Sequence, residues 1–254
     1  MNETVSQREP SFIKRNKGAL VAIIFGLLTI IGSIFIIYVN TYAKADETAI
    51  QTLNNSKLVD ITIDGALVIM QPPDTEVNTG IIFYPGGKVE AHSYAPLLEA
   101  LANEGYLAVI YQMPYNLAVF GMNAAADVIK RFPEIDHWYI GGHSLGGAMA
   151  SYYASRNPEK LGGYFALAAY PSSDLSKTSL KMLSIYGTED QILNFSNYEK
   201  YRSNAPEGAK YVEISGGNHA YFGNYGQQKG DGQATISREE QQRQTVELIL
   251  DFLN

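Results

Sequence analysis

The chain has 254 residues and a formal net charge of −7 at pH 7, of which the first seventeen residues contribute +2 and the remainder −9. Phosphate backbones repel an acidic body of this kind, which argues against nucleic acid as a partner. The chain lacks cysteine, which excludes disulfides and cysteine nucleophiles, and its four scattered histidines without an H-E-x-x-H motif argue against zinc. We expect no metal and no organic cofactor.

The N-terminal part of the chain predicts a membrane anchor. Residues 18–39 contain no charged side chain and, at 1.5 Å per residue, form a helix of about 33 Å, enough to cross a hydrocarbon core. Residues 1–17 hold four basic side chains and are predicted to be a cytoplasmic tail, with the rest of the chain outside. The alternative is a secretory signal cleaved near Ala45, because Ala43-Lys44-Ala45 offers a small-x-small site.

The pattern of the rest of the chain predicts an α/β domain. Residues 40–56 are polar and predict a linker or a short helix, and residues 57–254 alternate between strand-like and helical patterns. The predicted strands are 58–63, 66–70, 80–84, 106–111, 137–141, 163–169, 180–186 and 210–214. The predicted helices are 93–103, 120–131, 144–155, 196–203 and 238–253. This alternation predicts a mostly parallel twisted sheet of about eight strands with helices on both faces, beginning with an antiparallel hairpin at Asp64-Gly65.

A glycine-flanked serine lies between a predicted strand and a predicted helix. Gly142-His143-Ser144-Leu145-Gly146 fits the G-x-S-x-G pattern of a nucleophile elbow, in which the serine occupies a sharp, strained turn. Glycines two places either side of Ser144 leave room for the backbone to fold back on itself. The amide of Leu145 then lies at a helix N-terminus, where it meets developing negative charge.

Two later loops contain an acid and a histidine. Asp190 follows the strand 180–186, and His219 follows the strand 210–214. The chain order Ser144, Asp190, His219 is that of one hydrolase architecture and of neither common serine-protease order. Glu189 is the rival of Asp190 as the acid. The remaining histidines are expected to have local packing or surface roles: His92, His137 and His143.

Together with Tyr84-Pro85-Gly86-Gly87, these motifs resemble the α/β-hydrolases, and especially their compact, cap-less bacterial members similar to dienelactone hydrolase. The resemblance covers roughly residues 57–254. It implies that Ser144 is the nucleophile, His219 the general base and acid, and Asp190 the residue that orients the histidine. The family's spacing of glycine and acid favours Asp190 over the preceding glutamate.

Two backbone amides are expected to form an oxyanion hole, one of them from Leu145. By resemblance to a family loop that usually reads His-Gly-x, the second comes from Gly87. This chain has Pro85 where many relatives have histidine, which leaves the second donor open between Gly87 and Lys88. The stretch 223–235 after His219 is either a rim of the site or an ordered surface excursion, in which Asp231 is expected to be structural.

These features predict a membrane-anchored serine hydrolase that cleaves a small carboxylic ester or thioester through an acyl-enzyme on Ser144. The short connection 171–179 predicts an open site with no large lid. The alternatives are an acyltransferase or peptidase with the same three residues, and a tethered binding domain without catalysis, because a fold alone does not confer activity.

Overall fold

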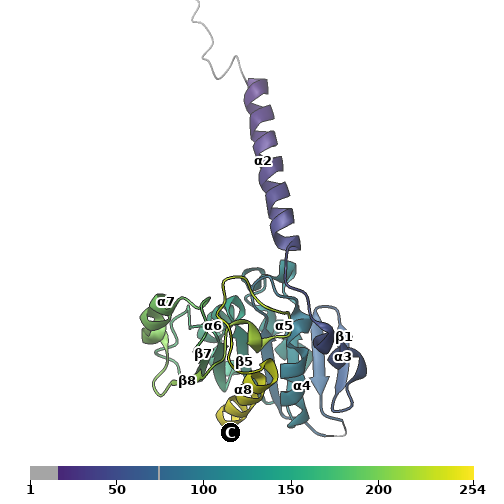
Figure 1. Ribbon diagram of the computed structural model, residues 1–254, viewed down its shortest axis with the longest axis vertical. Helices are drawn as coiled ribbons and strands as arrows, with labels where there is room; N and C mark the ends of the chain where they lie inside the picture. The colour runs from purple at the N-terminus through teal and green to yellow at the C-terminus, as the bar shows by residue number, and fades with distance from the viewer. Residues whose placement is uncertain (1–16, 74) are drawn as a thin grey trace, which may run out of the picture. The chain divides into compact units, whose positions relative to one another are not determined.

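A computed structural model describes residues 17–73 and 75–254 of the chain (Figure 1). The chain divides into two compact units, one ending at Thr41 and the other covering Tyr42–Asn254. The second, here called the C-terminal unit, contains every predicted strand and all of the predicted site residues.

The C-terminal unit is built on one eight-stranded sheet in the order β1-β2-β4-β3-β5-β6-β7-β8. The strands are β1 Asp60–Asp64, β2 Leu67–Gln71, β3 Thr79–Tyr84, β4 Leu107–Tyr111, β5 His137–His143, β6 Gly163–Leu167, β7 Lys181–Gly187 and β8 Lys210–Ile214. Strands β3 to β8 pair in parallel, whereas β2 pairs antiparallel with both β1 and β4. Gly65 adopts φ 59° in the β1–β2 turn, a conformation that favours glycine. The predicted hairpin and the predicted mostly parallel sheet are confirmed.

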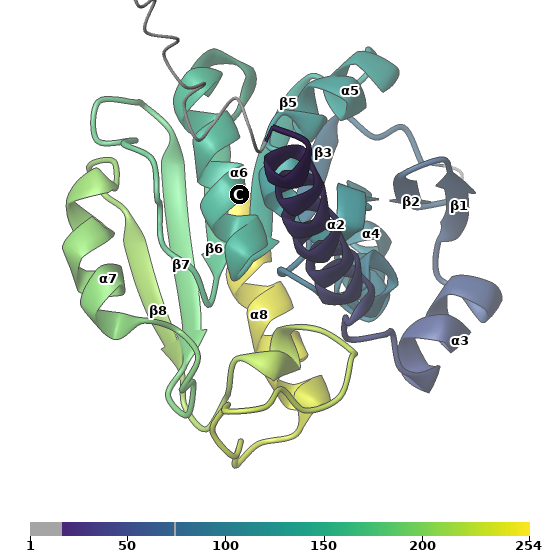
Figure 2. The ribbon, with the colours of Figure 1, turned by 90° about the horizontal axis from the view of Figure 1, so that it is seen from above.

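Helices cover both faces of this sheet (Figure 2). They are α3 Glu47–Asn55, α4 Ala95–Asn103, α5 Ala124–Arg131, α6 Leu145–Arg156, α7 Phe195–Lys200 and α8 Arg238–Leu253. Short 3-10 turns are η1 Ala91–Tyr94, η2 Pro114–Asn116, η3 Ala118–Phe120, η4 Pro158–Lys160, η5 Tyr201–Asn204 and η6 Ala220–Phe222. Successive residues of β3 enter different cores, as a strand's period of two requires. Phe83 packs in a cluster with Leu98 of α4 and Ile249 of α8, and Ile82 packs in one with Tyr153 of α6.

Much of the segment predicted as a linker or short helix belongs to the C-terminal unit. Ala43 forms a parallel bridge with Val89, and α3 begins after Asp46, whose side chain caps the helix. The carboxylate of Asp46 also lies 2.6 Å from the guanidinium of Arg238 in α8. These contacts tie residues 43–46 to the loop after β3 and to the last helix.

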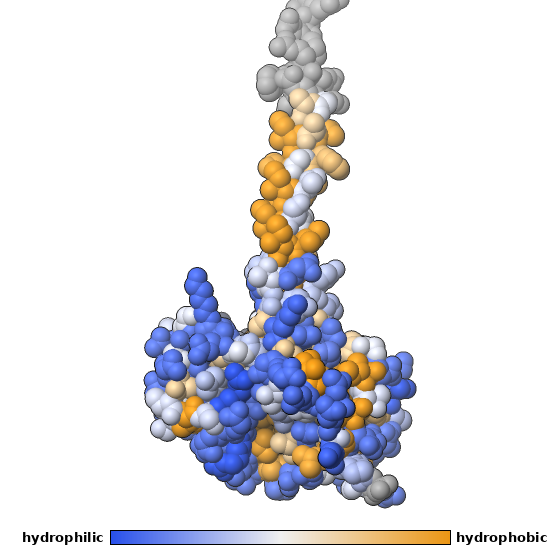
Figure 3. All heavy atoms as spheres, turned by 45° about the vertical axis from the view of Figure 1, so that its right-hand side comes forward, coloured by the Kyte–Doolittle hydropathy of each residue, from blue (hydrophilic) through white to orange (hydrophobic). Residues whose placement is uncertain are grey.

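The predicted transmembrane segment forms the helix α2, Lys17–Asn40. At 1.5 Å per residue its 24 residues extend about 36 Å. Large apolar side chains are exposed along its whole length and dominate its surface (Figure 3). The helix is long and apolar enough to cross a membrane, although a signal sequence has the same properties. The predicted cytoplasmic tail lies, apart from Lys17, outside the described residues.

Candidate active site

Ser144 occupies a strained turn between β5 and α6. Its backbone has φ 52° and ψ −123°, a combination that few residues with a Cβ adopt. The flanking glycines make the turn possible. A Cβ on Gly142 would lie 2.6 Å from the carbonyl oxygen of Tyr84, and one on Gly146 would overlap that same carbonyl. Side chains at either position would therefore push β5 and α6 away from the end of β3.

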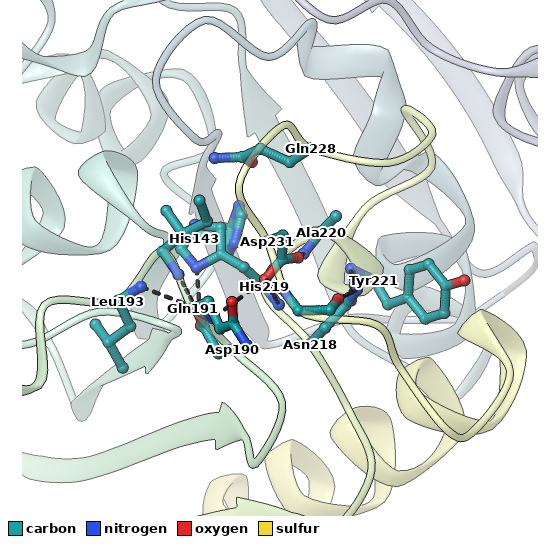
Figure 4. Close-up of polar contacts among 12 residues, drawn as sticks. His143, Asp190, Gln191, Leu193, Asn218, His219, Ala220, Tyr221, Gln228 and Asp231 are labelled. Carbon is teal, nitrogen blue, oxygen red and sulfur yellow. Dashed lines mark hydrogen bonds and ion pairs between the residues drawn. The ribbon is translucent and has the colours of Figure 1, made fainter.

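The imidazole of His219 is paired with the carboxylate of Asp190. His219 Nδ1 lies 2.8 Å from Asp190 Oδ2, and both side chains are almost fully buried (Figure 4). The other carboxylate oxygen, Oδ1, accepts hydrogen bonds of 2.8 Å from the amides of Ile192 and Leu193. A carboxylate held in this way keeps the proton of the neutral imidazole on Nδ1 and leaves Nε2 as the basic nitrogen.

The rival acid faces elsewhere. The Glu189 side chain accepts a hydrogen bond from the hydroxyl of Thr188 near the surface, and its amide donates to the carbonyl of Gly217. Asp190, the next residue, is the carboxylate that the structure places against His219.

Ser144 and His219 line one open cleft of about 250 Å³ at the carboxyl ends of the strands. Its walls come from the start of α6, from the segment after β6 and from the segment after Asp190. The other lining residues are Leu145, Ala148, Ala168, Ala169, Tyr170, Ile192, Leu193 and Asn194. The connection between β6 and β7 contains no helix, in agreement with the expected absence of a large lid at that point. The walls are mainly apolar, so the cleft favours an apolar group next to the serine.

The loop after β3 approaches the start of α6. A Cβ on Gly87 would lie 2.8 Å from Cδ2 of Leu145, so that only glycine permits this distance without displacing the leucine. The amide of Lys88, the other expected donor, is already used, because it donates to the carbonyl of Asn116 at 2.7 Å. Within the described residues, the amides of Gly87 and Leu145 donate to no other group. The geometry therefore favours Gly87 over Lys88 as the partner of Leu145.

A buried histidine that we expected to have only a local role lies beside this site. The ring centroids of His143 and His219 are 4.6 Å apart. His143 Nδ1 lies 2.8 Å from the hydroxyl of Tyr94, which accepts a 3.0 Å hydrogen bond from the amide of Gly86. Burial holds the pKa of His143 well below its usual value, so the ring stays neutral. The motif itself contains His143, but no local pattern in the sequence identifies Tyr94 as its partner.

The loop that carries His219 is held from α8. The side chain of Gln241 accepts from the amide of Asn218 at 2.9 Å and donates to its carbonyl at 2.8 Å. Gln241 is fully buried, so these hydrogen bonds form where competition from water is small. No group of three or more His, Asp or Glu side chains arranged to hold a metal ion occurs in residues 17–73 and 75–254.

Residues 80–243 match the sequence model of a family described as the alpha/beta hydrolase family. No curated protein matches the chain. Among solved structures, a predicted CIB-like hydrolase from Thermoplasma acidophilum is similar with a TM-score of 0.53 and 18% identity, over 76% of this chain and 97% of that one. Est1E from Butyrivibrio proteoclasticus is similar with a TM-score of 0.55 and 14% identity, over 77% and 98%. The complex of Est1E with ferulic acid gives 0.57 and 12%, over 77% and 96%. At these identities the likeness to the solved structures concerns the fold.

Proposed function

Because this chain belongs to the alpha/beta hydrolase family, we propose that it is a serine hydrolase that cleaves carboxylic esters or thioesters through an acyl-enzyme on Ser144. One observation carries the proposal. A buried imidazole–carboxylate pair, His219 and Asp190, borders the same cleft as a serine held on a strained turn. This is the set of groups that nucleophilic acyl transfer requires.

The proposed reaction has two halves. Ser144 Oγ attacks the carbonyl carbon of the substrate while Nε2 of His219 takes its proton, and Asp190 stabilises the imidazolium that forms. The tetrahedral oxyanion accepts hydrogen bonds from the amides of Leu145 and Gly87. Collapse of this intermediate breaks the bond to the alkoxide or thiolate, which receives the proton from His219. Water then attacks the acyl carbon while His219 takes its proton. The bond between Ser144 Oγ and the acyl carbon breaks, His219 returns the proton to Oγ, and the carboxylic acid leaves.

Esters and thioesters are the proposed substrates because their leaving groups need little help from protonation. The open cleft and its apolar walls suit an acyl group of modest size. The Est1E structure with bound ferulic acid concerns another protein, yet it supports small carboxylic acid derivatives as ligands for this fold.

A covalent probe and a substrate panel test this proposal. A fluorophosphonate should label the wild-type protein and the Ser155→Ala variant, which loses a hydroxyl from the same helix about three turns further along. Ser144→Ala should remain unlabelled and should lose hydrolysis of p-nitrophenyl esters. Equal labelling of Ser144→Ala and the wild type would refute Ser144 as the nucleophile. Faster turnover of peptide amides, or transfer to an acceptor alcohol in preference to water, would redirect the proposal to a peptidase or an acyltransferase.

We further propose that α2 anchors the enzyme in the cell membrane, with the C-terminal unit on the extracytoplasmic side. The uncharged length of the helix and the four basic residues before Gly18 support this orientation. An uncleaved anchor keeps the full-length protein in the membrane pellet after alkaline extraction, and external protease digests the C-terminal unit in intact cells or spheroplasts. A soluble product whose N-terminus lies near residue 46 would support cleavage near Ala45 instead.

A further inference from the structure

One carboxylate outside the proposed catalytic triad of Ser144, Asp190 and His219 accepts four backbone hydrogen bonds close to His219. Asp231 Oδ1 accepts from the amides of Gln191 and His219 at 3.3 Å and from its own neighbour Gly232 at 2.8 Å. Asp231 Oδ2 accepts from the amide of Ala220 at 2.9 Å. Figure 4 shows Asp231 next to His219 and Ala220.

These amides belong to two loops that are distant in the sequence. Gln191 directly follows Asp190 in the loop after β7, and His219 lies in the loop after β8. One carboxylate therefore binds the backbone next to the triad acid and the backbone of the triad base. Hydrogen bonds to a charged acceptor are stronger than neutral ones, so the bridge resists separation of the two loops.

The backbone next to Asp231 packs closely against the loop after β7, which carries Asp190. A Cβ on Gly232 would overlap the carbonyl oxygen of Glu189, so only glycine allows the chain to pass this close. The side chain of Asn218, in the loop after β8 that carries His219, donates a 2.9 Å hydrogen bond to the carbonyl of Gly232. This bond fixes the same segment. The stretch 223–235 thus returns to the site and inserts one carboxylate between its two loops.

We propose that Asp231 is a positioning residue that keeps the imidazole of His219 aligned between Asp190 and Ser144 during turnover. The inference rests on the proposed serine hydrolase function and deepens it. Asp231 touches no reacting atom. It acts by fixing the main chain at Gln191, His219 and Ala220 through hydrogen bonds to their backbone amides.

The test compares Asp231→Ala and Asp231→Asn in the full-length protein. The alanine removes all acceptors, whereas the asparagine keeps one carbonyl oxygen for the amides and loses the charge. The matched control is Asp174→Ala, because Asp174 also accepts a backbone amide, that of Ser176, but in an exposed turn that contacts neither loop. Thermal unfolding establishes that each variant is folded.

A positioning role predicts a loss in kcat with little change in KM. Displacement of a catalytic group by about 1 Å costs roughly 100-fold, so Asp231→Ala should lose 10- to 100-fold in kcat on a p-nitrophenyl ester, with KM within about twofold. Labelling of Ser144 by a fluorophosphonate, which also needs the base, should slow by a similar factor. Asp231→Asn should recover part of both rates, and Asp174→Ala should match the wild type.

Different outcomes would overturn the positioning role of Asp231 and the proposed hydrolase function. The positioning role is wrong, while the hydrolase function stands, if two results are found together. A folded Asp231→Asn must have the wild-type kcat and labelling rate, and a folded Asp231→Ala must have a kcat and labelling rate no lower than those of Asp174→Ala. If Asp231→Ala does not fold, the asparagine variant decides, because a loss in its kcat without a change in KM supports the role and unchanged rates overturn it. A wild-type protein without hydrolysis or labelling overturns the proposed function and this inference together.

Discussion

Replacement of Ser144 by glycine should stabilise the protein while abolishing its proposed activity. The serine holds φ 52° and ψ −123°, where a residue with a Cβ costs about 1–3 kcal/mol. Glycine removes that strain but raises the entropy of the unfolded chain, which costs about 0.4–1 kcal/mol relative to alanine. With mid-range values of about 2 and about 0.7 kcal/mol, the free energy of unfolding of Ser144→Gly should exceed that of Ser144→Ala by roughly 1.3 kcal/mol.

Differential scanning calorimetry of the two variants measures this difference directly. Both lack the hydroxyl, so the comparison isolates the Cβ. For a domain of this size about 1 kcal/mol shifts the melting temperature by about 2–4 °C, so the glycine variant should melt roughly 3–5 °C above the alanine variant. The control is Ala126→Gly on the exposed face of α5, where a helical backbone gains nothing from glycine and about 1 kcal/mol should be lost. A Ser144→Gly variant that melts at or below Ser144→Ala would show that the turn stores no strain.

Three further predictions concern the surroundings of the site. Tyr94→Phe removes the buried hydroxyl that bonds the amide of Gly86 and the ring of His143. Urea titration should show a free energy of unfolding lower by about 1–3 kcal/mol, and kinetics should show slower ester turnover. Folding lowers the pKa of His143, so below the usual pKa of histidine the unfolded chain binds more protons than the folded protein. The contribution of His143 to the free energy of unfolding should therefore be complete above about pH 6.5. On acidification it should decline by at most about 1.4 kcal/mol per pH unit. Urea titrations of His143→Gln should show a flatter dependence between pH 6.5 and 5, and an equal slope in both proteins would contradict the assignment to His143. A soluble fragment that starts at residue 42 retains the bridge between Ala43 and Val89, whereas a fragment that starts at residue 47 lacks it. The shorter fragment should have the lower kcat in the same ester assay. Equal kcat values would mean that this bridge does not support the site.

The sheet and most of its helices could be predicted from the sequence, since strands and helices impose a local hydrophobic period that does not depend on distant contacts. Each of the eight apolar runs became a strand of one sheet, and the turn at Gly65 formed the first hairpin. The candidate nucleophile, acid and base could be selected in the same way, because each follows a predicted strand and lies in a glycine-containing loop. In a parallel sheet, such loops meet at one edge.

Only the tertiary structure decided which neighbouring groups face the site. Adjacent side chains and adjacent amides point in different directions, and local sequence does not say which direction leads to a partner far along the chain. That is why Asp190 and Glu189 remained rivals until the contact with His219 was seen, and why the amide of Lys88 proved to be used by Asn116. The bonds of Tyr94 to His143 and of Asp231 to two loops join residues far apart in sequence, so they exist only once the sheet has brought the strand ends together.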